Sequence, residues 1–377
     1  MKNILPAFFL LLFFQLAHAQ QFTLSDHMSA REIGQAMQAY PPSIDHVDAR
    51  MLIAQSLDKL IHFSVKQDIT DEQVAELAPI RDLYLRQVDH NLDALEQSKV
   101  AEGVRIFKFY SSSVIIQSKE GVIAVDFQQG PHLTYCGNPD KPDPVAVRTG
   151  FHWSPQQLDR LARLVDVSLI THAHADHADY ELSRRLAALK KTTIVTQQLK
   201  ELWKNLGESL VVPDYGTAQQ FGPVSIYTML GHQYMENDKA TKDSAGNVYG
   251  HPSTDPSITD AETVVYLARI GGLVFLQAGE NNDPADEWLQ KGMALGFTPD
   301  IKMSVGARQG ARSVNAALAG KPIFFLPVHE YEMGHGGGGN RTAVYYADNR
   351  GNLIRKGGCM PLFWGENYAI NDSMLRK

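Results

Sequence analysis

The sequence is poor in cysteine, with only Cys136 and Cys359 in 377 residues. Two thiols far apart in the chain cannot form the disulfide network of a small secreted scaffold, although they could form one bridge in an oxidising compartment. Whether the two cysteines pair is left open by the sequence. The chain also contains no block of lysine and arginine, and its formal net charge is −7. This charge pattern gives no support to a nucleic-acid partner.

Long apolar runs are equally scarce, and the one present is at the N-terminus. Residues 4–16 are apolar apart from a proline and a glutamine, and they lie between Lys2 and the small-x-small sequence Ala17-His18-Ala19. The run is too short to span a bilayer and has the layout of a signal peptide, with an uncleaved anchor as the alternative. We therefore expect residues 1–19 to be removed, and the mature chain, with no transmembrane segment, to be exported to the periplasm or secreted.

Two helices are predicted before residue 100. Apolar residues recur at helical spacing over 45–66, and a second apolar stripe runs from 74 to 97. Thr70 and Gln73 form a capping box that begins the second helix, and Pro79 is expected to bend or interrupt it. We interpret residues 20–100 as a helical N-terminal appendage. Packing on the main domain is the simplest role, and dimerisation or covering of an active site are the alternatives.

Beyond Gly103 the pattern changes to alternating strands and helices. Three β-rich runs over 104–127 indicate an antiparallel meander, and Ser154 with Pro155 begins a helix. A buried strand follows at 165–170. Further helices are expected at 181–190 and 310–319, and further strands at 192–196, 224–230, 263–267, 273–277 and 322–328. This alternation is typical of a layered α/β domain, which we assign to residues 101–377.

Directly after the buried strand, the stretch "ITHAHADHADY" (170–180) concentrates histidine and aspartate. His172 and His174 are two residues apart after a strand end, so an extended backbone points both imidazoles the same way. Asp176 and His177 lie where the chain turns into the next helix. Nitrogen and carboxylate ligands from one loop suit zinc and similar cations. A polar surface loop is the simpler alternative, and a structural zinc site would normally use cysteines.

This stretch resembles the H-x-H-x-D-H signature of the metallo-β-lactamase superfamily. Later segments resemble that family's remaining motifs in order: "VSIYTMLGHQ" with His232, "GGLVFLQAGEN" with Glu280, and the strand-helix-strand segment that reaches His329. Asp179-Tyr180 and the "PVH" sequence are most similar to the branch with L-ascorbate-6-phosphate lactonase and the N-acylphosphatidylethanolamine-hydrolysing phospholipase D.

The resemblance implies an αββα sandwich with two metal ions at one edge of its paired sheets. Zn²⁺ is the expected cofactor, with Mn²⁺ or Fe²⁺ as alternatives. Carried over, one metal would be held by His172, His174 and His232, the second by Asp176, His177 and His329, and both by a bridging Glu280. The family usually has aspartate at the bridging position, so Asp283 is an alternative ligand.

The implied activity is hydrolysis of an ester-type bond, a phosphodiester or lactone, by a metal-activated hydroxide that Asp176 orients. The substrate would be a small or lipid-like molecule. A β-lactam or amide hydrolase, an iron redox protein and a non-catalytic binding protein on the same fold are the alternatives. Candidate substrate contacts are His251, His335 and Arg341. A solvated loop position is the alternative for His251, and a flexible loop is the alternative for His335 and Arg341. Asp179 and Tyr180 are expected to support the ligands or to begin the next helix. The oligomeric state, a homodimer included, is left open.

Overall fold

The structure is a computed structural model, and it describes residues 23–61, 70–130, 148–174, 176–234, 241–242, 248–249, 260–279, 281, 285–305, 323–331, 359 and 361–375. Several predicted features lie outside these residues: the signal peptide, the helix at 310–319, Cys136, His251, Glu280, Asp283, His335 and Arg341. Cys359 is described as a buried free thiol, and burial raises the pKa of its thiol well above the usual value.

The first sheet has seven strands in the order β15-β1-β2-β3-β4-β5-β6. The predicted meander is confirmed as its antiparallel part, and the strands from β3 to β6 are parallel. The strands are β1 (Val104–Lys108), β2 (Val114–Gln117), β3 (Val122–Val125), β4 (Val167–Leu169), β5 (Thr192–Ile194), β6 (Leu210–Val211) and β15 (Asn367–Ile370). The last of these pairs with β1, so the C-terminal strand closes one edge of the sheet.

The second sheet has six strands in the order β14-β13-β12-β11-β8-β7, antiparallel from β7 to β12 and parallel from β12 to β14. The strands are β7 (Ala218–Phe221), β8 (Val224–Tyr234), β11 (Asp260–Ile270), β12 (Leu273–Gln277), β13 (Ile301–Val305) and β14 (Phe324–Val328). The short strands β9 (Thr241–Lys242) and β10 (Val248–Tyr249) pair only with each other among the described residues.

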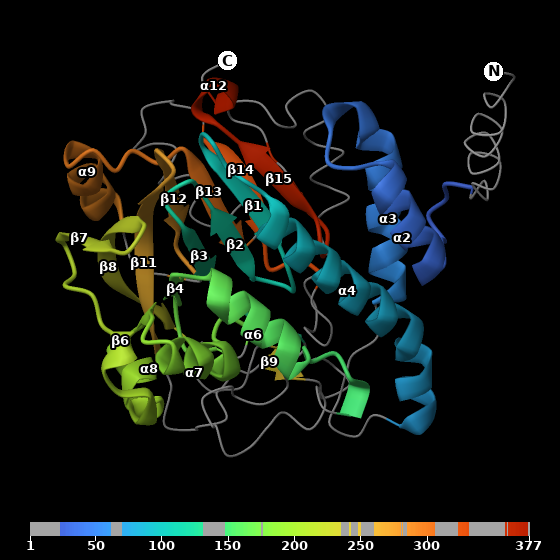
Figure 1. The fold of residues 1–377 in the computed structure, drawn as a ribbon, viewed down its shortest axis with the longest axis horizontal. Helices are drawn as coiled ribbons and strands as arrows, with labels where there is room; N and C mark the ends of the chain where they lie inside the picture. The colour runs from blue at the N-terminus through green and yellow to red at the C-terminus, as the bar shows by residue number, and fades with distance from the viewer. Residues whose placement is uncertain are drawn as a thin grey trace, which may run out of the picture.

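The two sheets face each other across a shared apolar core. Ile116 and Ile123 of the first sheet belong to the same buried cluster as Val264 and Phe275 of the second. Helices α6 (Pro155–Leu164) and α7 (Tyr180–Ala188) cover the outer face of the first sheet, and α9 (Asp286–Ala294) packs on that of the second. These layers confirm the expected αββα sandwich (Figure 1). The sandwich also carries the short helices α8 (Gln197–Leu202), η2 (Lys204–Ser209) and α12 (Asp372–Leu375).

The N-terminal region forms three helices, α2 (Ala30–Ala39), α3 (Val47–Leu60) and α4 (Asp71–Gln97), with a short turn η1 (Ile44–His46). The predicted capping box is confirmed: Thr70 Oγ1 accepts from Gln73 N, and Gln73 Oε1 accepts from Thr70 N at 2.8 Å. The predicted interruption at Pro79 is wrong, because α4 continues through this residue. Buried Leu77 and Ile80 on either side hold the helix together where the proline removes one backbone donor.

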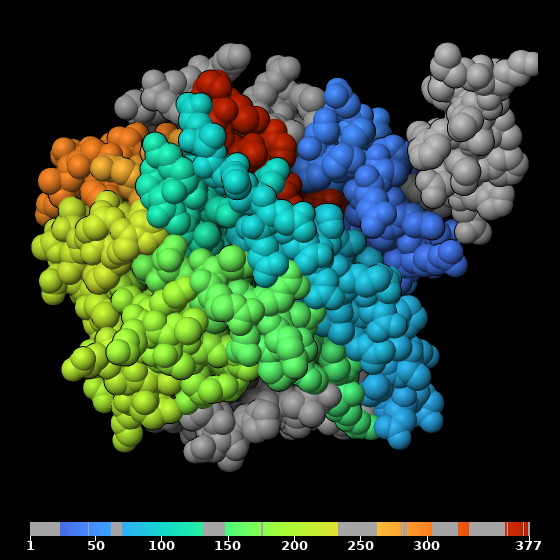
Figure 2. Space-filling model, viewed as in Figure 1, coloured from blue at the N-terminus to red at the C-terminus, as the bar shows by residue number. Residues whose placement is uncertain are grey.

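These helices pack directly on the sandwich. Residues of α2, α3 and α4 share one buried cluster with the outer face of the first sheet and with α6. Arg50 of α3 is fully buried and donates to both carboxylate oxygens of Glu366, at 2.8 and 2.6 Å, just before β15. In Figure 2 the side chains of α4 and α6 form one continuous surface. No helix in the described part of the chain is long and apolar enough to cross a membrane.

Candidate metal centre

The predicted ligand loop joins the end of β4 to the start of α7, and its polar side chains are buried. His172 and His177 have no exposed surface, and His174 and Asp176 are at most 4% exposed. Backbone bonds anchor the loop to the sheets: Thr171 O accepts from Val264 N of β11 at 2.7 Å. Burial of so many ionisable groups is costly unless they bind one another or a cation. Burial of this loop therefore favours a bound cation or a dense network of hydrogen bonds.

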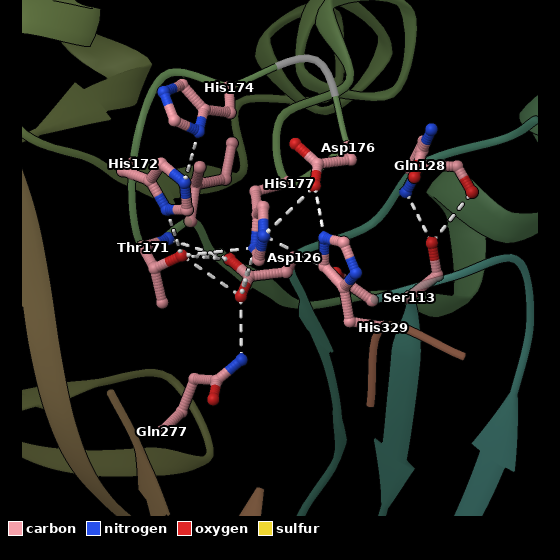
Figure 3. A network of polar contacts seen from close by, with 12 residues as sticks. Ser113, Asp126, Gln128, Thr171, His172, His174, Asp176, His177, Gln277 and His329 are labelled. Carbon is pink, nitrogen blue, oxygen red and sulfur yellow. Dashed lines mark hydrogen bonds and ion pairs between the residues drawn. The ribbon is translucent and has the colours of Figure 1, made fainter. Parts of the chain in front are cut away.

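His172 and His174 lie side by side, as the spacing of the motif predicts (Figure 3). His172 Nε2 is 3.0 Å from His174 Nδ1, and the ring centroids are 4.4 Å apart. Two imidazole nitrogens bound to one tetrahedral zinc, at ~2.0 Å each, would be about 3.3 Å apart. The observed separation is close to that value. These two nitrogens can therefore converge on a single cation.

Asp176, His177 and His329 form a second group of ligand atoms, all within 4.8 Å of one another. Asp176 Oδ2 is 3.4 Å from His177 Nε2 and contacts His329 Nε2. His329 follows β14, and its backbone N donates to Ser111 O at 3.1 Å, which holds it against the loop. Two imidazoles and a carboxylate are a donor set that fits zinc or iron. The residues present therefore fit the second metal that the sequence predicts.

Asp126 connects the two groups and was not predicted from the sequence. It follows β3, is fully buried and has a φ of 44°. Its Oδ2 lies 3.1 Å from His177 Nδ1 and accepts from Gln277 Nε2 at 2.7 Å, while its Oδ1 accepts from Thr171 N at 2.7 Å. The only signal in the sequence is an aspartate at the end of the apolar run "VIAV".

This network determines which imidazole nitrogens remain available for a metal. The Asp126 carboxylate can only accept, so His177 Nδ1 must donate to it. Thr171 Oγ1 gives its own proton to Asp126, so at 2.9 Å it can only accept from His172 Nδ1. Metal-bound histidines usually give their second N–H to a carboxylate or similar acceptor. The Nε2 atoms of His172 and His177 are therefore left with their lone pairs facing the two ligand groups.

The electrostatics of the two histidines differ. Burial lowers the pKa of His172 well below the usual value, and the neighbouring histidines add to this. Burial also disfavours a charged His177, but the carboxylates of Asp176 and Asp126 outweigh it and raise the pKa of His177. His172 is therefore neutral and ready to bind a cation. His177 keeps a second proton, on Nε2, to higher pH than His172 does, and below its raised pKa a metal would have to displace that proton.

The turn between β1 and β2 forms one wall of this region. Ser112 is fully buried, and its Oγ lies 3.5 Å from His177 Nε2. Ser113 Oγ accepts from Gln128 N at 2.6 Å and donates to Gln128 O at 2.7 Å, which fixes the turn. The sequence indicated this Ser-Ser-Ser stretch only as a break between strands. Ser112 is therefore a second polar residue of the site that sequence reasoning missed.

The third histidine of the motif series, His232, is half-buried on β8, and the strand extends past it to Tyr234. Its backbone N donates to Asn281 Oδ1 at 3.1 Å. Among the described residues, only Asp176, His177 and His329 form a group of three close ligand atoms. The roles of His232 and of Glu280 as ligands stay predictions.

Asp179 and Tyr180 begin α7, which confirms one of the two alternatives predicted for them. Asp179 is the N-cap, and its Oδ1 accepts from Leu182 N at 2.8 Å. Its second oxygen accepts from Gln129 Nε2 at 3.0 Å. Tyr180 is the first helical residue, and its hydroxyl accepts from Asn205. The helix that follows the ligand loop is therefore fixed at its first turn.

No protein-family model matches the chain, and no curated protein sequence matches it. Among solved structures it is similar to a possible metal-dependent hydrolase from Veillonella parvula, with 16% identity and a TM-score of 0.44 over 72% of this chain and 100% of that one. It is also similar to isothiocyanate hydrolase from Delia radicum gut bacteria, with 15% identity and a TM-score of 0.45 over 71% and 99%. These likenesses are weak, so the function is inferred from the residues of the site.

Proposed function

We propose that the protein is an exported metal-dependent hydrolase of the metallo-β-lactamase superfamily that cleaves an ester-type bond, a phosphodiester or a lactone, in a small or lipid-like substrate. The observation that carries this proposal is the pair of buried donor groups, His172 with His174 and Asp176 with His177 and His329, joined by Asp126. A binding protein has no need for so many buried metal-type ligands at one edge of its fold.

A bound divalent metal would lower the pKa of a coordinated water to about 7 and polarise the scissile bond. His172 and His174 would hold one ion, together with His232, and Asp176, His177 and His329 would hold the other. Glu280 is the proposed bridge. Asp126 keeps His177 in the tautomer that binds metal, because it accepts the Nδ1 proton.

Asp176 is the residue that we assign to proton movement. Its Oδ2 lies between His177 and His329, and its side chain is buried. A carboxylate in this place can orient the attacking water and pass its proton to the leaving group. His251, His335 and Arg341 remain proposed substrate contacts.

The first test is metal content. The mature protein, stripped with a chelator and reloaded with zinc, manganese or iron, should retain one to two equivalents per chain, by analogy with two-metal hydrolase sites. The double variant His172→Ala/His174→Ala should lose most of this metal. His90→Ala, an exposed histidine on α4, is the matched control and should retain it. Unchanged metal in the double variant would contradict the assignment.

The second test is substrate class. The loaded protein should hydrolyse a chromogenic phosphodiester or lactone, and His177→Ala should abolish the reaction while His90→Ala does not. Preferential turnover of a β-lactam would retain the hydrolase but replace the proposed ester substrate. Stoichiometric metal with no turnover of any of the three would favour the binding protein.

A further inference from the structure

The N-terminal helices reach the ligand loop through a chain of buried hydrogen bonds. Tyr84 of α4 donates its hydroxyl proton to Gln129 O at 2.5 Å. The Gln129 side chain then donates from Nε2 to Asp179 Oδ2 at 3.0 Å, and Asp179 Oδ1 accepts from Leu182 N at 2.8 Å. The chain thus begins in the helical appendage and ends in the first turn of α7.

Each group in this chain has a defined hydrogen-bonding role. Trp153 donates from its indole nitrogen to the Tyr84 hydroxyl at 2.9 Å and from its backbone N to Gln129 Oε1 at 3.0 Å. Tyr84, Gln129, Trp153 and Asp179 are all buried. If one member moved, a buried polar group would lose its partner, which is unfavourable in an apolar surrounding. The chain therefore holds the position of Asp179 firmly.

The position of Asp179 matters because it follows the ligands closely in a tight turn. Asp179 is two residues after His177 and three after Asp176. The backbone N atoms of His177 and Ala178 both donate to His174 O at 3.1 Å, so the loop behaves as one turn. A shift of Asp179 would therefore be passed to both ligands.

The ring of Tyr84 packs beside the β1–β2 turn, which in turn contacts His329. Its centroid is 5.6 Å from that of Tyr110 and 5.2 Å from that of Trp364. Tyr110 begins the β1–β2 turn, whose Ser111 carbonyl accepts from His329 N. Tyr84 is thus linked to the ligand loop through Gln129, and it packs on the turn that holds His329.

The hydroxyl of Tyr84 acts as a hydrogen-bond donor in this chain. Burial raises its pKa far above the usual value for tyrosine, and the charge of Asp179 adds to this effect. The raised pKa favours the neutral phenol, which is the form that donates to Gln129 O. Tyr84 therefore contributes by holding Gln129 in position.

We propose that Tyr84 and Gln129 are positioning residues for the cation held by Asp176, His177 and His329, so that the helical appendage is a working part of the metal site. The identity of the ligand rests on the proposed function. The effect of Tyr84 and Gln129 on the order of the loop does not depend on the proposed function, and it can be measured in the metal-free protein.

The variants are Tyr84→Phe, which keeps the ring and removes the hydroxyl, and Gln129→Met, which keeps the side-chain length. Asn91→Leu is the matched control. Asn91 is also buried on α4, but it donates to Lys108 O of β1 at 2.8 Å rather than to the chain that ends at Asp179. Tyr84→Phe and Asn91→Leu each remove a buried bond between α4 and the sandwich, and Gln129→Met removes the buried bonds of its side chain to Asp179 and Trp153. All three should therefore lower the thermal midpoint of the full mature protein.

Two readouts separate positioning from general stability. In the metal-free protein, hydrogen exchange over residues 177–183 should rise in Tyr84→Phe and Gln129→Met and stay at the wild-type level in Asn91→Leu. The affinity for the weaker of two zinc ions, measured by competition with a chromogenic chelator, should fall roughly fivefold in the first two variants. This is less than the 10–100-fold typical of groups bonded directly to a ligand. Asn91→Leu should retain wild-type affinity.

The proposal is wrong if both test variants keep wild-type exchange over 177–183, or if Asn91→Leu increases it equally. Wild-type zinc affinity in both test variants would also overturn it. A wild-type protein that binds no zinc would refute the proposed function, and the exchange data would still decide whether Tyr84 and Gln129 order the loop. If Tyr84→Phe does not fold, Gln129→Met carries the test.

Discussion

Replacing Asp126 with asparagine should weaken metal binding more than it weakens the fold. The side chain keeps its shape, but one acceptor oxygen becomes a donor. On the Oδ1 side, Thr171 N can still donate to the remaining oxygen. On the Oδ2 side, the new amide would face two donors, His177 Nδ1 and Gln277 Nε2.

The expected change in stability follows from how those two donors can respond. A buried donor without an acceptor lowers the free energy of unfolding by about 1–3 kcal/mol. Two donors that each face the new amide donor would therefore lower it by about 2–6 kcal/mol if nothing relaxed. Among the described residues, Gln277 Oε1 has no hydrogen-bond partner. A flip of the Gln277 amide would therefore place Oε1 against the new donor and relieve one of the two conflicts. We expect the free energy of unfolding of the metal-free protein to fall by about 1–3 kcal/mol.

His177 cannot relieve its conflict with the new amide without a change of tautomer. To accept from the new amide, its Nδ1 must lose the proton, and the proton then moves to Nε2, the nitrogen that faces Asp176. Metal must displace that proton before it binds. Loss of a carboxylate behind a ligand histidine typically weakens metal affinity 10–100-fold, or about 1.4–2.8 kcal/mol.

The assay compares Asp126→Asn with Asp166→Asn as the control. The wild-type Asp166 carboxylate also accepts a backbone N–H, from Val122 of β3 at 2.9 Å, but Asp166 lies just before β4 at an exposed position. Zinc competition gives the affinity, urea unfolding of the metal-free protein gives stability, and nitrogen NMR shifts of His177 report its tautomer. Wild-type zinc affinity in Asp126→Asn, or an unchanged tautomer, would refute the reasoning.

Three further predictions concern pH, the bridge and the N-terminus. The pKa of His172 is lowered and that of His177 is raised, so metal-free stability should rise with pH up to about 6.5, the ordinary histidine value, and fall above it through the raised pKa of His177. Urea unfolding against pH tests this, and a flat profile would contradict both shifts. The Glu280→Gln variant should lose the weaker of the two metals that the wild-type protein is expected to bind, because less negative charge would lie between the two cations. If Asp283→Asn removes it instead, Asp283 is the bridge. N-terminal sequencing of exported protein should begin at Gln20, and an uncleaved product in the membrane would indicate an anchor.

The sequence predicted the parts of this fold that depend on local patterns. The capping box at Thr70 and the apolar stripe behind it predicted α4, and the H-x-H spacing placed His172 and His174 against each other. The helix α2 was missed, although Ser29 and Glu32 form the same kind of capping box. Its apolar stripe is short, so the periodicity alone was too weak to indicate a helix.

The parts that were missed depend on contacts between distant segments. Asp126 looks like any aspartate after a strand until β12 brings Gln277 to it. Strand β8 was predicted to end near 230, but its ladder with β11 continues to Tyr234 opposite Asp260, because the partner strand sets its length. The link from Tyr84 to Asp179 joins three segments and has no sequence pattern of its own.

The topology explains why these distant residues meet. Strands β1 and β3 run in the same direction as β4 in the first sheet, and β8, β12 and β14 share one direction in the second. Segments at the C-terminal ends of these strands carry Ser112, Asp126, the ligand loop, His232, Gln277 and His329. In α/β sheets such ends are the usual place for ligands. The Asp126–Gln277 bond crosses between the two sheets at this edge, so the network that orients the histidines also joins the halves of the sandwich there.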